Sequence, residues 1–63
     1  MVDLLVQGHG SIFLLQPASC RGRRWIDDHV AAGREEWAGA VVVEARFITD
    51  IVAGALADGL EVR

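Results

Sequence analysis

His9 is one of the side chains in the sequence that are best suited to chemistry. It stands between Gly8 and Gly10 and is followed by Ser11. Glycines let backbone N–H groups approach an anion, and a histidine can add a proton or a metal bond. The segment is not a Walker motif, because the spacing and the GK[ST] ending are absent. It therefore predicts either a hairpin turn with a polar tip, which we favour, or one side of an anion site.

A cluster of three arginines, Arg21, Arg23 and Arg24, follows later in the chain. A guanidinium holds a carboxylate or phosphate through paired hydrogen bonds. Arg21 and Arg24 therefore join His9 and Ser11 as candidates for binding an anion. Two aspartates follow the cluster at once and can neutralise it, which favours a solvated helix face instead.

The single cysteine, Cys20, precedes Arg21 at the start of a predicted helix, a setting that favours a reactive thiolate. With His9 or His29 it could form a nucleophile–base pair, but no third residue suggests itself to orient that pair. We therefore predict a structural or incidental cysteine and no catalytic residues. One cysteine and two histidines are also too few for a four-ligand zinc site, and we expect no metal and no cofactor.

The first half of the chain alternates apolar runs with turn signals. Residues 2–6 and 11–16 are apolar runs joined by a glycine-containing segment, which predicts a β-hairpin. Pro17 ends the second run, because proline cannot donate a hydrogen bond to the ladder. Ser19 is then a suitable N-cap for a helix that Gly33 would end as its C′ residue.

The second half repeats the pattern of strand and helix. Residues 38–44 contain three consecutive valines and predict a strand that is buried on both faces. Residues 45–58 carry apolar side chains at helical spacing and predict a second helix, with Gly59 as its terminator. Residues 60–63 could add a short final strand.

These elements predict an α/β fold in one domain, residues 1–63, with the order β-β-α-β-α and a possible last β. The second and third strands flank a helix, so a right-handed parallel crossover is expected between them. We expect both helices on one face of a small mixed sheet of three or four strands. The architecture would then be a two-layer sandwich with α+β character.

The second sheet face has no predicted cover, yet alternate positions on both faces of the strands are apolar. A large exposed apolar patch marks an interaction surface, which predicts a homodimer, although loops or the C-terminus could cover the face instead. Trp37 either wedges under the first helix or contributes to the interface. The interface candidates are Leu5, Phe13, Leu15, Trp37, Val41 and Val43.

Composition excludes some classes of function and supports self-association. The net charge is −3 and no lysine is present, which argues against nucleic acid as a partner. No apolar run approaches the ~20 residues of a membrane span. We expect a cytoplasmic protein, which suits an unpaired cysteine. A chain of 63 residues is marginal as a monomer, and 52% of its residues are hydrophobic.

Three strings span most of the chain: GHGSIFLLQP at residues 8–17, W-x-G-x-x-V-V-E at 37–44 and DGLEVR at 58–63. The combination resembles a group of small proteins of bacterial plasmids and prophages that have no assigned activity. The resemblance implies an accessory protein of a mobile genetic element. We expect a non-enzymatic, protein-binding homodimer. The alternatives are a small acidic inhibitor of a host or defence protein and an anion-binding or small-molecule-binding module that uses residues 8–11.

Overall fold

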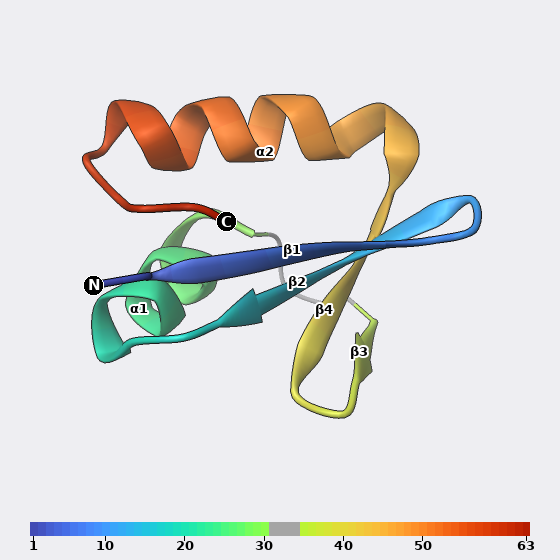
Figure 1. The fold of residues 1–63 in the computed structure, drawn as a ribbon, viewed down its shortest axis with the longest axis horizontal. Helices are drawn as coiled ribbons and strands as arrows, with labels where there is room; N and C mark the ends of the chain where they lie inside the picture. The colour runs from blue at the N-terminus through green and yellow to red at the C-terminus, as the bar shows by residue number, and fades with distance from the viewer. Residues whose placement is uncertain (31–34) are drawn as a thin grey trace.

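Two β-hairpins and two helices make up the protein, which we describe from a computed structural model of residues 1–30 and 35–63 (Figure 1). The elements are β1 (Leu4–His9), β2 (Ile12–Pro17), α1 (Cys20–His29), β3 (Glu36–Trp37), β4 (Ala40–Glu44) and α2 (Ala45–Ala57). The predicted hairpin, both helices and the central strand are confirmed, and β3 is an addition. The predicted helix stop at Gly33 lies outside the described residues, whereas α1 ends at His29 and Val30 is already extended.

The sheet has the strand order β1-β2-β4-β3, and every neighbouring pair is antiparallel. The predicted parallel crossover onto the strand beside β2 is therefore wrong. Since β3 is antiparallel to β4, and β4 to β2, β3 runs in the same direction as β2. Residues 38–39 then reverse the chain, and β4 returns antiparallel beside β2. The prediction missed this reversal because it counted these two residues as part of the strand 38–44.

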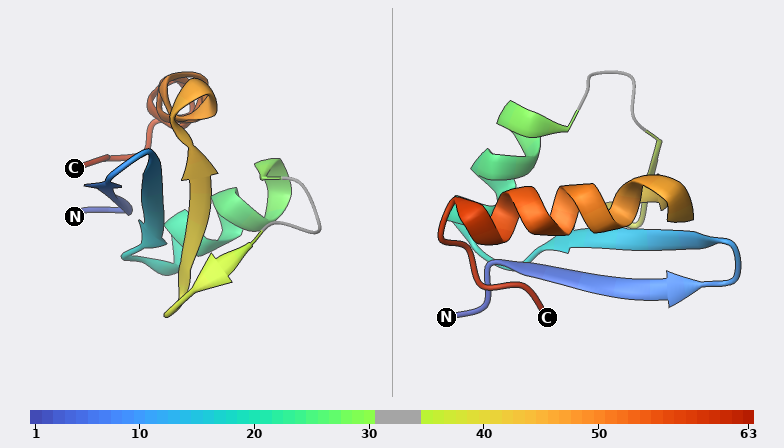
Figure 2. Two further views of the ribbon diagram at one scale, coloured as in Figure 1. Left: turned by 90° about the vertical axis from the view of Figure 1, so that its right-hand side faces the viewer. Right: turned by 90° about the horizontal axis from the view of Figure 1, so that it is seen from above.

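The end of the chain extends the sheet beyond β1. Val62 forms a parallel bridge with Leu4. The Arg63 N–H donates to the Leu4 carbonyl at 3.0 Å, and the Val6 N–H donates to the Arg63 carbonyl at 2.6 Å. The possible final strand at residues 60–63 is thus present as a single bridge. This bridge is parallel, whereas the other strand pairs are antiparallel, so the sheet with its bridge is mixed. Figure 2 shows the two ends of the chain side by side.

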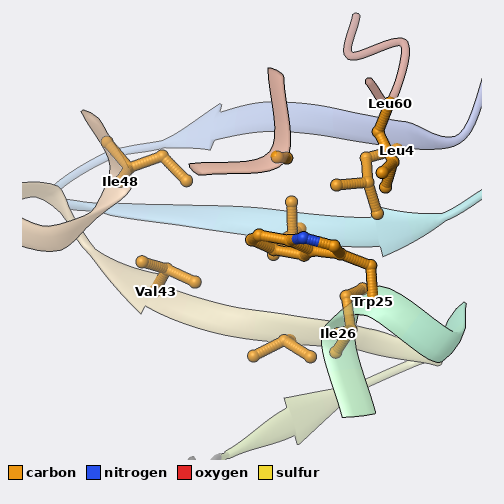
Figure 3. Close-up of a cluster of buried hydrophobic side chains, with 9 residues drawn as sticks. Leu4, Trp25, Ile26, Val43, Ile48 and Leu60 are labelled. Atoms are coloured by element: carbon orange, nitrogen blue, oxygen red, sulfur yellow. The ribbon is translucent and has the colours of Figure 1, made fainter. Parts of the chain in front are cut away.

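Both helices cover the same face of the sheet, as predicted, and together they form a two-layer α+β sandwich. Apolar side chains from the strands, the helices and the C-terminal segment form one cluster between the layers. In Figure 3 the Trp25 ring reaches from α1 over the middle of the sheet. The buried members of this core are Leu4, Leu15, Trp25, Ile26, Val41, Val43, Ile48, Ala55 and Leu60.

Helix α1 begins against the backbone of the N-terminal segment. Ser19 is its N-cap, as predicted, and the hydroxyl accepts from the Gly22 N–H at 3.0 Å. The same hydroxyl donates to Asp3 Oδ1 at 2.7 Å. A Cβ on Gly22 would lie 1.9 Å from the Asp3 carbonyl oxygen, closer than any real contact. The helix therefore reaches this position only because residue 22 has no side chain.

We expect Gly22→Ala to destabilise the protein by about 3 kcal/mol or more, because the added methyl group meets backbone rather than a movable side chain. Gly54→Ala is the matched control, since its Cβ would lie at an ordinary 3.6 Å from the Trp25 ring. At position 54, the better helix propensity of alanine should stabilise the protein by about 1 kcal/mol. Urea unfolding followed by circular dichroism measures both, and equal stabilities would contradict the close approach.

Candidate functional site

The face of the sheet away from the helices is open. Alternation along the strands and the pairing register give this face one residue set, listed here by strand: Leu5, Gln7 and His9 of β1; Ile12, Leu14 and Gln16 of β2; Ala40, Val42 and Glu44 of β4; Trp37 of β3. Among its apolar members, Leu5 is 42% exposed and Trp37 is 59% exposed, whereas Leu14 and Ala40 are buried. The expected exposure of apolar side chains on this face therefore holds for Leu5 and Trp37. We call this surface the open face.

Trp37 stands between two hollows of the open face, and its side chain borders both. One hollow, of about 420 Å³, includes Leu5, Gln16 and Arg63 in its lining. The other, of about 350 Å³, includes His9 and Glu35 and lies towards the tip of the first hairpin. The imidazole of His9 meets the indole edge to face, with 6.1 Å between ring centroids. The two hollows therefore follow one another along the strands, with Trp37 as the ridge between them.

The second hairpin holds Trp37 in this position. Trp37 pairs with Ala40 across the ladder, and the Val42 N–H extends the ladder by donating to the Glu35 carbonyl at 2.8 Å. The loop between them consists of Ala38 and Gly39, both with positive φ, at 51° and 83°. Two positive values are typical of a type I′ turn, whose twist suits a two-residue hairpin. Of the two interpretations of Trp37, the wedge under the first helix is wrong, because the ring lies on the opposite face of the sheet.

The interface candidates from the sequence divide between the two faces. Leu5 and Trp37 lie on the open face. Leu15, Val41 and Val43 are instead buried under the helices, and Phe13 packs against the same core. These four are therefore corrected to core positions. The physical reason is that the centres of the strands are apolar on both faces, and the prediction rested on those centres. The polar residues at the strand ends, Gln7, His9, Gln16 and Glu44, all lie on the open face and mark it. The partly exposed apolar residues of this face that the sequence interpretation missed are Ile12 and Val42.

The structure does not bring the anion-binding candidates together. His9 and Ser11 belong to the tip of the first hairpin, whereas Arg21 and Arg24 lie in α1, beyond the far end of β2. The six residues of β2 separate the two pairs by about 20 Å. Arg21 also donates to the carbonyl of Asp58 at 3.3 Å. An anion site built from all four residues is therefore excluded.

Cys20 and the two histidines are also far apart. Cys20 is exposed and opens α1, while His29 closes it, about 13 Å further along the helix axis. The His29 ring stacks on Trp25, with 4.6 Å between centroids, and its Nδ1 lies 3.0 Å from the Trp25 carbonyl oxygen. The Trp25 Nε1–H donates to Asp58 Oδ2 at 2.7 Å. His29 therefore takes part in fastening α1 to the end of α2, a contact that sequence reasoning missed.

No protein-family model, curated protein or solved structure matches this chain. Within residues 1–30 and 35–63, neither helix has the length and apolar character that crossing a membrane requires. The open face, with Trp37 of the edge strand β3 bordering both hollows, is the candidate site that the geometry itself supplies.

Asp3 is the buried charged residue next to the hollow that Cys20 and Arg21 border, and it is only 5% exposed. Its carboxylate accepts from the Glu61 N–H at 2.9 Å and from the Ser19 hydroxyl. These two bonds, the first above all, lower the pKa of Asp3 below its ordinary 3.8, while burial acts in the opposite sense. Each carboxylate oxygen thus accepts a hydrogen bond from within the chain, and these bonds stabilise the fold.

A carboxyl whose pKa is lower in the folded state stabilises the protein above its ordinary value and loses that contribution as the pH falls through the folded value. We expect Asp3→Asn to be less stable than the natural chain at neutral pH and to lose less stability between about pH 5 and about pH 2. Asp50→Asn, at an exposed helical carboxyl, is the control. The urea concentration at the midpoint of unfolding, measured across this pH range, tests the expectation. If this midpoint changes with pH in the same way for the natural and Asp3→Asn proteins, the stabilising role of the Asp3 carboxylate is contradicted.

We expect Ala38→Asn to stabilise the protein by about 1 kcal/mol, because asparagine tolerates positive φ better than alanine does. The same substitution at Ala53, an exposed position within α2, should destabilise by about 0.5 kcal/mol. Thermal unfolding of both variants separates the turn effect from a general effect of asparagine. A loss of stability at both positions would show that residue 38 does not hold the left-handed conformation.

Proposed function

We propose that this protein is a non-enzymatic binding protein that works as a homodimer through the open face of its sheet. The observation that carries the proposal is Trp37, a large apolar side chain that is 59% exposed between two hollows. Tryptophan is the residue type most enriched among those that dominate binding energy at protein interfaces. A partner can bury the exposed indole in a pocket of its own. It can also insert its own side chains into the two hollows beside the indole.

The size of the chain supports self-association. A domain of 63 residues hides only about 60% of its unfolded surface, so it gains from burying a further apolar face. One long side of the molecule, 27 × 19 Å, has a projected area of about 510 Å². The smaller specific interfaces bury about 500 Å² on each partner. The open face is therefore large enough for a dimer interface of this smaller class.

A second candidate is the small acidic inhibitor of another protein, which the net charge of −3 favours. In that case the open face would meet a foreign, basic surface, and the protein alone would be a monomer. The setting on a mobile genetic element and the cytoplasmic location rest on the sequence and remain predictions. An anion site that joins His9 and Ser11 to Arg21 and Arg24 is not carried forward, because these residues lie in two separate places. A site that uses residues 8–11 alone stays a prediction from the sequence.

Light scattering after size exclusion, over a wide range of concentrations, tests the homodimer. We expect a dimer for the natural chain and at least about 30-fold weaker association for Trp37→Ser, since removing such an anchor costs about 2 kcal/mol or more. Leu56→Ser is the matched control, because Leu56 is a similarly exposed apolar residue, 55%, on α2. Urea unfolding confirms that both variants are folded.

Two results would overturn the proposal. A monomer at every concentration would exclude self-association and favour the inhibitor. A dimer that Leu56→Ser dissociates, while Trp37→Ser leaves it intact, would place the interface on α2 instead of the open face.

A further inference from the structure

We infer that the hollow lined by His9, Glu35 and Trp37 is a binding site for a guanidinium group, and that its occupant is Arg63 of a second copy of this chain. The inference rests on the proposed homodimer and names the contact that orients its two copies. For clarity we call this hollow the guanidinium site; its lining includes His9, Ile12, Glu35, Trp37 and Val42.

The chemistry of the hollow suits an arginine side chain. Tryptophan offers the best aromatic face for a cation, and guanidinium groups use such faces most often. The alternation of β3 puts Glu35 on the same sheet face as Trp37, opposite Val42. A carboxylate there can accept two parallel hydrogen bonds from a guanidinium. The floor is apolar and includes Ile12, which suits the aliphatic stem of the side chain.

Arg63 is the cation that the same face provides. Among the described residues that line the two hollows, it is the one with a permanent positive charge, and it borders the hollow on the other side of Trp37. Within its own chain it contacts Glu61, with 2.9 Å between Nη2 and Oε2. Its side chain is 70% exposed, and exposed ion pairs of this kind contribute little. Arg63 can therefore exchange this partner for a carboxylate of a second copy.

Symmetry brings opposite edges of the open face together. The interface of a two-fold dimer consists of the same patch on both copies, so each contact occurs twice. Arg63 pairs beside β1, whereas Glu35 pairs with β4 at the other edge of the sheet. A two-fold axis lying in the open face along the strands, near β2, therefore sets the Arg63 edge of one copy over the Glu35 edge of the other, and two guanidinium sites close at once. This local match offsets the repulsion between two chains that each carry a charge of −3.

Charge reversal tests the pairing by light scattering after size exclusion. We expect Arg63→Glu and Glu35→Arg each to weaken the dimer by about tenfold or more, because each change sets like charges against each other in both sites. The double variant Arg63→Glu with Glu35→Arg should recover most of the natural affinity. The control is Arg23→Glu, which makes the same change of net charge on α1, away from the open face. It should leave the affinity within about threefold.

The outcomes separate this inference from the proposed function. If Trp37→Ser dissociates the dimer while Arg63→Glu behaves like Arg23→Glu, the open face is the interface but the guanidinium site is wrong. If both charge reversals weaken the dimer and the double variant does not recover, the two residues act separately and their pairing is wrong. If the natural chain is a monomer, the proposed function fails and this inference fails with it.

Discussion

One buried carboxylate holds together three parts of the chain that are far apart in sequence. Asp3 precedes β1, its Oδ1 accepts from the N-cap hydroxyl of α1, and its Oδ2 accepts from the backbone of Glu61. The main chain of Asp3 is equally involved, because Gly22 lies directly against its carbonyl group. The start of the sheet, the start of α1 and the C-terminal segment are thereby fixed to one another, and the layer order of the protein depends on this junction.

The open face is a consequence of this junction. With α1 held at the end of β1 and β2, the Trp25 indole extends over the sheet and donates to Asp58 at the end of α2. This bond ties α2 to the same side, and Gly59, with φ of 85°, lets the chain turn back so that Leu60 enters the same core. Both helices and Leu60 then pack on one face of the sheet, and neither helix covers the open face.

The sequence predicted the elements well because their signals are local. The periodicity of residues 45–58, the Ser19 cap and the glycine-containing first turn depend only on near neighbours. The second hairpin was not predicted, because alanine at position 38 is not a residue that indicates a positive φ. The predicted direction of the strand beside β2 was then wrong. The covered face was missed for another reason, because the prediction compared only the apolar centres of the strands. Over the full strands the open-face set includes Gln7, His9, Gln16 and Glu44, whereas the covered positions of β1, β2 and β4 carry no polar side chain.

The second hairpin carries two features that folding of the single chain does not explain. Trp37 contributes its large apolar surface to solvent rather than to the core, and Ala38 holds a backbone conformation that costs a non-glycine residue about 1 kcal/mol. A strained turn persists where the surroundings or a function maintain it. Here the turn follows Trp37 directly and sets the ring between the two hollows. The proposed partner on the open face would give this arrangement a physical reason, because the indole would then be buried against a second surface.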